Sequence, residues 1–273
     1  MDNKTKRYVI IGVLGFLVVA VLAGVLVGLL MVSNNLPDLS SKSKMVSPQT
    51  VDTPLAPSPP SAPKDVTLRT EDGVAIAATY YLAKGDGVIL LHMLGSDRSV
   101  WSSFAKQLQD AGFAVIALDF RGHGESDLDW RDFASPSGIT YENDFLGMVL
   151  DVKAAKKYLN GEGTFAKVII GASIGANIAT LYAETDSRVE DLVLLSSSMN
   201  YRGVALPAGP LFTGNVLMVA GSEDKVASEA TTTYGRRIRG EHKTILYPGS
   251  DHGTELLQRQ PELADRIISW IDR

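Results

Sequence analysis

The segment at 171–175, Gly-Ala-Ser-Ile-Gly, holds the residue best suited to act as a nucleophile. An apolar β-like run ends at Gly171 and a helical run begins at Ile174, so Ser173 falls on a sharp strand-to-helix turn that exposes its hydroxyl. Such a strained turn leaves no room for side chains at the positions that flank the serine, which explains Gly171 and Gly175. The pattern predicts Ser173 as the nucleophile of an acyl-transfer reaction.

A serine hydroxyl needs a general base, and the chain has four histidines. His252 is the predicted base, because it lies in a glycine-containing loop at 247–253 that follows the last β-like run. The carboxylate that orients the base should come from a strand end between nucleophile and base. Asp224 is the predicted carboxylate, with the adjacent Glu223 as the alternative, and Asp251 is interpreted as a loop neighbour of His252.

Two backbone amides are expected to stabilise the oxyanion that develops during acyl transfer. The N–H of Ile174 directly follows the nucleophile and lies at the positive end of the predicted helix. The second N–H is expected from the loop after the apolar run at 88–92, at either Met93 or Leu94. His92, in the same loop, is interpreted as a structural hydrogen-bonding residue.

The segment at 119–126, Asp-Phe-Arg-Gly-His-Gly-Glu-Ser, closes another apolar run. Its alternating glycines indicate a tight loop, which we interpret as scaffold beside the nucleophile. His123 has no second histidine or carboxylate at the spacing of metal ligands, so a metal site is not expected there.

The elements that must position these residues alternate between strands and helices. Two β-prone runs, 66–69 and 74–81, are split by Glu-Asp-Gly and predict an antiparallel hairpin. Apolar runs without polar alternation follow, as expected for strands covered on both faces, and helical patterns such as 142–159 and 254–271 separate them. The fold class predicted is α/β, with a mostly parallel, doubly wound sheet and helices on both faces, over residues 65–273.

The N-terminal part has a different composition. Residues 8–32 are apolar apart from glycines, and this run exceeds the ~20 residues that a transmembrane helix needs. Cations precede it within 1–7, which predicts a cytoplasmic N-terminus, a single-pass anchor in the cell membrane and a domain outside the cytoplasm. A cleaved signal peptide is the alternative, although no small-x-small site ends the run. The Ser/Pro-rich residues 33–64 are predicted to be a linker.

Charge and cysteine content exclude several functions. The formal net charge is −5 and the pI about 5.4, so nucleic acid is not an expected partner. The sequence contains no cysteine, which excludes disulfides, thiolate catalysis and sulfur-ligated metals.

With these segments placed, the chain resembles the α/β-hydrolase superfamily across 66–273. Five motifs occur in the family's order, at 91–95, 119–126, 171–175, 221–224 and 251–253. Within the superfamily the chain is similar to small, capless serine hydrolases of the dienelactone-hydrolase and carboxylesterase kind, although dienelactone hydrolases commonly have cysteine in place of Ser173. The resemblance implies hydrolysis of a small-molecule acyl substrate through an acyl-enzyme, with Ser173, His252 and Asp224 as the catalytic triad and no cofactor.

Several alternatives stay open. A peptidase or an acyltransferase would use the same triad, and a binding module could keep the fold without activity. The interval 199–215, where many relatives insert a helical lid, is short, so a large lid is not expected and small or medium acyl esters should be preferred. The segment 128–140, with Trp130 and Phe133, is the alternative lid. Arg202 is either a cation for an acidic substrate or an exposed loop arginine.

Overall fold

The computed structural model describes residues 61–133, 144–209 and 212–273. The predicted cytoplasmic segment 1–7, the predicted anchor 8–32 and the linker up to residue 60 lie outside the described residues. Among the residues that are described, no helix is both long enough and apolar enough to span a bilayer.

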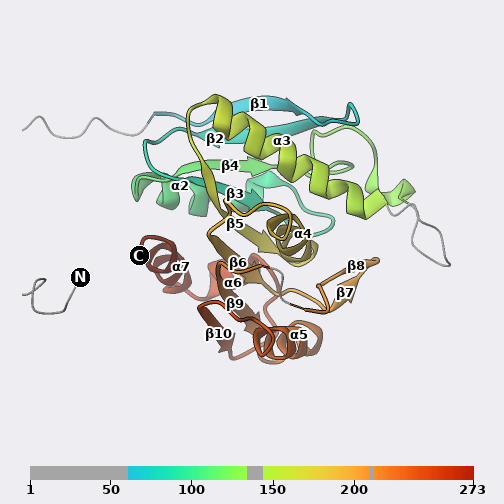
Figure 1. Cartoon of the computed structure of the whole chain (residues 1–273), viewed down its shortest axis with the longest axis vertical. Coiled ribbons are helices and arrows are strands. Elements are labelled where there is room, and N and C mark those ends of the chain that lie inside the picture. Colours follow the sequence, from blue (N-terminus) through green and yellow to red (C-terminus); the bar gives the residue numbers. More distant parts are fainter. Residues whose placement is uncertain (1–60, 134–143, 210–211) are drawn as a thin grey trace, which may run out of the picture. The chain divides into compact units, whose positions relative to one another are not determined.

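The described residues form an eight-stranded sheet with the order β1-β2-β4-β3-β5-β6-β9-β10, from the top of Figure 1 to its bottom. The strands are β1 (Lys64–Arg69), β2 (Ala75–Tyr81), β3 (Gly87–Leu91), β4 (Ala114–Leu118), β5 (Ala166–Ala172), β6 (Asp191–Leu195), β9 (Asn215–Gly221) and β10 (His242–Tyr247). Strand β2 pairs antiparallel with both β1 and β4, and all other pairs are parallel. The predicted hairpin and mostly parallel sheet are therefore confirmed, and the first strand begins at Lys64.

Helices cover both faces of this sheet. They are α2 (Ser102–Asp110), α3 (Met148–Gly161), α4 (Ile174–Ala183), α5 (Lys225–Gly235), α6 (Glu255–Arg259) and α7 (Leu263–Ile271), with short 3-10 helices η1 (Arg98–Trp101), η2 (Trp130–Asp132) and η3 (Asp144–Gly147). Side chains of α3 and α4 pack into one core and those of α2 and α7 into the other. Strand β3 shows why its sequence lacks polar alternation: Ile89 and Leu91 enter the first core, whereas Val88 and Leu90 enter the second.

One predicted element was wrong. The run 254–271 was expected to be a single helix, but it is divided into α6 and α7. Pro261 lies at the break, where it cannot donate a backbone hydrogen bond and where its ring would clash with the preceding turn of a continuous helix.

The strand order also fixes where a site can form. From β3 the chain passes through α2 to β4 on one side of β3, and then through α3 to β5 on the other side. The carboxyl ends of β3 and β5 therefore meet at the point where the direction of winding reverses. In open α/β sheets ligands bind at such a point.

Candidate active site

Ser173 occupies the turn between β5 and α4 with a strained backbone, φ 53° and ψ −119°. Its N–H donates to the carbonyl of Leu195 at 2.8 Å, which ties the turn to β6. The neighbouring glycines leave no room for side chains: a Cβ on Gly175 would lie 2.5 Å from the Leu91 carbonyl oxygen, and one on Gly171 would lie 2.6 Å from the Ala176 nitrogen. The side chain of Ser173 is partly exposed at this turn.

His252 and Asp224 are in direct contact. Nδ1 of His252 lies 2.5 Å from Oδ2 of Asp224, and the Asp224 side chain is the more buried of the two. The other carboxylate oxygen, Oδ1, accepts a hydrogen bond from the Ala227 N–H at 3.2 Å, because Asp224 also caps the N-terminus of α5. Asp224 is thereby held in one orientation by the backbone of the helix that follows it.

The two other carboxylates near this pair lie elsewhere. Glu223 is exposed, and its N–H donates to the carbonyl of Gly249. Asp251 forms an ion pair with Arg259 at 3.5 Å. The structure thus brings Asp224, and not Glu223, to His252, and Asp251 is a loop neighbour as expected.

The loop that carries His252 crosses the end of β5. The N–H of Gly253 donates to Oγ of Ser196 at 2.9 Å. A Cβ on Gly253 would lie 3.5 Å from the Cβ of Ala172, the residue immediately before Ser173. No hydrogen bond joins Ser173 Oγ to His252, both of which are described; such bonds are often long in unliganded enzymes and shorten with substrate.

The contacts around Met93 fix the orientation of the Leu94 N–H, one of the two candidates for the second oxyanion amide. The carbonyl of Met93 accepts hydrogen bonds from His92 Nδ1 at 2.8 Å and from the Ser96 N–H at 3.2 Å. In a trans peptide the N–H points opposite to the carbonyl. The N–H of Leu94 therefore points away from His92, and it has no hydrogen-bond acceptor among the described residues. The N–H of Ile174 at the start of α4 has none there either.

His92 is structural, as its position in the sequence suggested. Its Nε2 accepts the N–H of Phe120 at 2.9 Å while its Nδ1 donates to Met93. Complete burial lowers the pKa of the ring to about 3, so the ring is neutral near neutral pH. A neutral ring with one donor and one acceptor joins the loop after β3 to the loop after β4.

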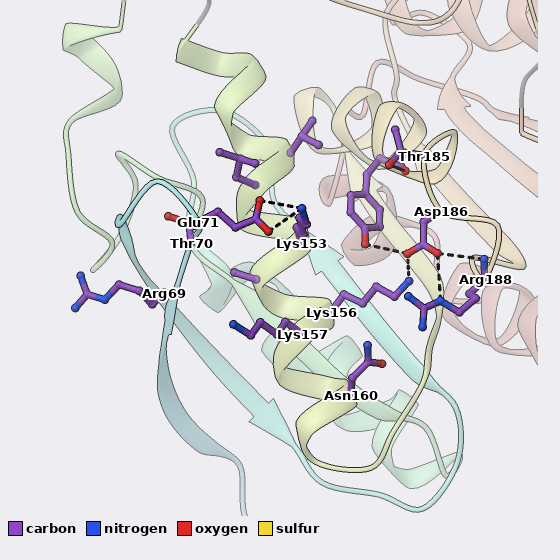
Figure 2. A pocket seen from close by; sticks show the side chains of 14 residues that line it. Arg69, Thr70, Glu71, Lys153, Lys156, Lys157, Asn160, Thr185, Asp186 and Arg188 are labelled. Atoms are coloured by element: carbon purple, nitrogen blue, oxygen red, sulfur yellow. Dashed lines mark hydrogen bonds and ion pairs between the residues drawn. The ribbon is translucent and has the colours of Figure 1, made fainter.

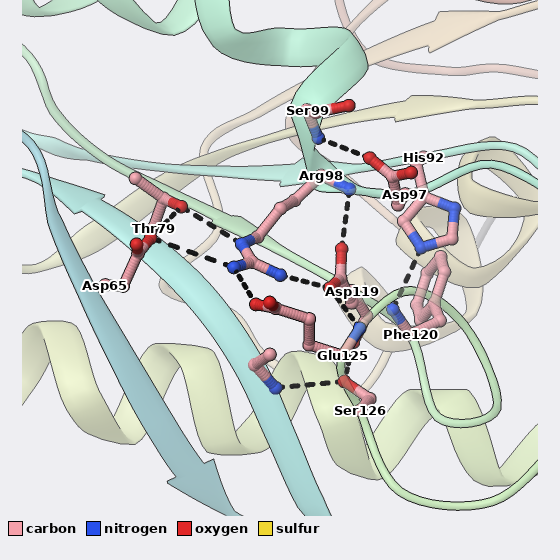
Figure 3. Close-up of polar contacts among 11 residues, drawn as sticks. Asp65, Thr79, His92, Asp97, Arg98, Ser99, Asp119, Phe120, Glu125 and Ser126 are labelled. Atoms are coloured by element: carbon pink, nitrogen blue, oxygen red, sulfur yellow. Dashed lines mark hydrogen bonds and ion pairs between the residues drawn. The ribbon is translucent and has the colours of Figure 1, made fainter.

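The loop after β4 is built around a buried carboxylate (Figure 3). Asp119 accepts the N–H of Arg98 at 2.6 Å and that of Glu125 at 2.9 Å, and it forms an ion pair with the Arg98 guanidinium. Arg98 also donates to Thr79 on β2 at 3.1 Å. Figure 3 shows that these contacts draw η1, β2 and the segment 119–126 together, which agrees with the interpretation of that segment as scaffold.

The aromatic residues of the alternative lid pack onto the protein where they are described. Trp130 stacks on His123 with ring centroids 5.6 Å apart, and Phe133 meets Phe145 edge to face at 5.3 Å. Burial lowers the pKa of His123. Residues 134–143 of this segment lie outside the described residues.

Across the described ranges no group of three or more His, Asp or Glu side chains is arranged to hold a metal.

One functional residue was not singled out from the sequence. Asn177 is completely buried one turn after Ser173, where its Nδ2 donates to the carbonyls of Ser198 and Val204, both at 2.8 Å. Its Oδ1 accepts the Ser198 N–H at 3.1 Å. These bonds fix the segment with β7 (Asn200–Tyr201) and β8 (Val204–Ala205) to the nucleophile helix. The available signal was an amide side chain within an otherwise small and apolar helix.

Comparison with known proteins agrees with the observed fold. A family model described as serine aminopeptidase, S33, matches residues 85–211. The chain is a member of the α/β-hydrolase superfamily. Among curated relatives within this superfamily, a 2-(acetamidomethylene)succinate hydrolase of Mesorhizobium japonicum is 26% identical over 193 residues, which are 69% of this chain and 64% of that protein.

An uncharacterized protein of Mycobacterium tuberculosis is 27% identical over 156 residues, covering 54% of this chain and 41% of that protein. The chain thus spans less than two thirds of the length of these curated relatives.

Solved structures of α/β hydrolases share the fold. An esterase from Pyrococcus furiosus is 20% identical with a TM-score of 0.62, covering 78% of this chain and 92% of its own. A dienelactone hydrolase from Anabaena variabilis is 17% identical with a TM-score of 0.60, covering 78% and 95%.

Proposed function

We propose that this α/β hydrolase is a serine hydrolase that cleaves a carboxylic ester, or a related acyl bond, of a small-molecule substrate. The observation that carries the proposal is the 2.5 Å contact between His252 and Asp224, made by residues from two different strand ends. Gly253, next to His252, lies against Ala172, next to Ser173. Nucleophile, base and orienting carboxylate thus come from the loops after β5, β10 and β9.

In the proposed reaction Ser173 Oγ attacks the substrate carbonyl while His252 Nε2 accepts the hydroxyl proton. Asp224 stabilises the imidazolium that forms. The N–H groups of Ile174 and Leu94 hydrogen-bond the oxyanion of the tetrahedral intermediate. His252 then protonates the leaving alcohol, and it later deprotonates the water that hydrolyses the acyl-enzyme and regenerates Ser173.

Three observations support a small-molecule acyl substrate. Esterases are among the solved structures that share the fold, and a curated relative is named as a hydrolase of a small succinate derivative. Between β6 and β9 the described residues form only the two-residue strands β7 and β8, without a helix. This favours an open site and small or medium acyl groups over long-chain lipids.

A fluorophosphonate probe and a panel of acyl esters test the proposal. Wild-type protein should be labelled on Ser173 and should hydrolyse short p-nitrophenyl esters, and Ser173→Ala should lose both properties while it melts at an unchanged temperature. Absence of labelling in the wild-type chain would favour the alternative, a binding module that keeps the fold without activity.

A second candidate, a peptidase, is favoured by the description of the matching family model as a serine aminopeptidase. Aminoacyl p-nitroanilides in the same panel separate the two activities. Faster turnover of the anilides than of the esters would identify the chain as a peptidase.

We further propose that residues 8–32 anchor the chain in the cell membrane with the hydrolase domain outside the cytoplasm. The length of the apolar run and the cations before it support this. Membrane fractionation combined with protease access tests it. Release of soluble protein cleaved near residue 32 would overturn the anchor.

A further inference from the structure

A basic groove lies on the α3 and α4 side of the sheet, apart from the predicted triad. It has a volume of about 640 Å³, within the range of small-molecule sites. Its walls come from the turn after β1, from α3 and from the C-terminal end of α4 (Figure 2). None of Ser173, Asp224 and His252 lines it.

The groove carries more cations than carboxylates. Its cations are Arg69, Lys153, Lys156, Lys157 and Arg188, and its carboxylates are Glu71 and Asp186. The excess of three positive charges is notable because the chain as a whole carries a formal charge of −5. A concave surface of one sign concentrates ligands of the opposite sign.

The ion pairs within the groove leave this excess uncompensated. Lys153 pairs with Glu71 at 2.7 Å. The single carboxylate of Asp186 is shared by Lys156 and Arg188, and it also accepts the hydroxyl of Tyr182.

The last two cations have no carboxylate partner within 61–133, 144–209 and 212–273. Arg69 donates to the uncharged carbonyl of Gly73 at 2.9 Å, and Lys157 is exposed without a hydrogen-bond or ion-pair partner among the described residues. In Figure 2, Arg69 at the end of β1 and Lys157 on α3 have no dashed contact to the other residues drawn.

Apolar side chains also line the groove. Val149, Leu150 and Ala154 of α3 line it beside the cations. A free phosphate ion would use only the charges, whereas an amphiphile with an anionic head would use the charges and the apolar strip together.

From this combination we propose that the groove binds an anionic phospholipid, with its phosphate attracted by the cations of the groove, Arg69 and Lys157 among them, and an acyl chain along the apolar residues of α3. The proposal does not depend on hydrolysis by Ser173. A membrane surface rich in such lipids would then hold the domain in one orientation through this groove.

Because the sequence contains no cysteine, a single introduced thiol reports on the groove. Asn160 lines the groove and is exposed and uncharged, so Asn160→Cys is the reporter. The exposed Gln107 on α2, which packs on the other face of the sheet, gives the matched control Gln107→Cys. Full-length chain is reconstituted in nanodiscs of phosphatidylcholine, with or without phosphatidylglycerol, and its reaction with N-ethylmaleimide is timed.

Phosphatidylglycerol should slow labelling of Asn160→Cys about fivefold or more and leave Gln107→Cys within about twofold. Adding Arg69→Glu and Lys157→Glu should restore the fast rate, whereas Lys243→Glu, an exposed cation on β10, should not. A cooperative thermal unfolding transition near that of the wild-type chain shows that each variant is folded. Equal rates in both kinds of nanodisc, or protection that survives the charge reversals, would overturn the proposal. Equal protection by millimolar inorganic phosphate in phosphatidylcholine nanodiscs would also overturn it, in favour of a site for free anions.

Discussion

Asp224 and His252 are separated by 28 positions in the chain, yet their side chains meet at 2.5 Å. The contact uses Nδ1 of the imidazole, which leaves Nε2 as the ring nitrogen available to a proton from Ser173. The Ala227 N–H holds the second carboxylate oxygen of Asp224, so rotation of this side chain would break two interactions at once.

Asp224→Asn is expected to reduce kcat for ester hydrolysis by about 10³- to 10⁴-fold, because an amide favours the wrong tautomer of His252. The adjacent Glu223→Gln is the matched control and should stay within about twofold of wild type, since Glu223 is exposed and does not contact the imidazole. Steady-state kinetics on a short ester gives both values. Comparable losses in the two variants would mean that the orienting carboxylate has been misassigned.

Stability should depend on pH through His92. Burial lowers the pKa of this ring from 6.5 to about 3. Between these values the unfolded chain binds a proton that the folded chain does not, so the free energy of unfolding falls as pH drops, by at most about 1.4 kcal/mol per pH unit from this group. Urea unfolding at about pH 7 and about pH 5 should show a smaller loss for His92→Gln than for wild type.

Asn177→Leu should lower the free energy of unfolding by about 2–4 kcal/mol, because it leaves buried groups of Ser198 and Val204 without partners. Thr180→Val, in the same helix, removes a hydroxyl whose bond goes to the Ala176 carbonyl, and should cost about 1 kcal/mol or less. Denaturant titration measures both. A loss for Asn177→Leu no larger than that for Thr180→Val would show that these bonds do not hold the β7–β8 segment.

Hydrolysis should be fastest for short and medium acyl chains and should change smoothly through the solubility limit of the substrate. The reason is that the described part of the interval between β6 and β9 supplies only β7 and β8, and that Trp130 and Phe133 pack against His123 and Phe145. Rates of p-nitrophenyl esters measured above and below their solubility provide the check. A steep rise at the limit, with long chains preferred, would reveal a lid.

The sequence predicted the residues that depend on local chemistry. The turn at Ser173 was recognisable because only glycines fit beside it, and the apolar runs identified the parallel strands because both of their faces are covered. Asp224 could be preferred over Glu223 because its shorter side chain suits the turn after the strand, but the contact with His252 depends on the meeting of two loops from separate strands.

Interactions between distant segments could not be predicted in this way. Asn177 binds backbone carbonyls more than twenty residues away, and nothing in its own neighbourhood specifies those partners. The orientation of the Leu94 amide likewise depends on His92, whose ring is fixed by Phe120 from the loop after β4. The division of 254–271 was missed although its cause, Pro261, was visible in the sequence.

The chain between β6 and β9 contributes none of the predicted catalytic groups. It nevertheless lies beside α4, the helix that follows Ser173, and is held there by hydrogen bonds from Asn177. Insertions or deletions after Val204 would leave Ser173, Asp224 and His252 in place, because the loops that carry these three follow β5, β9 and β10. Changes of substrate preference among descendants of this protein should therefore concentrate in that single stretch, while the rest of the domain diverges slowly.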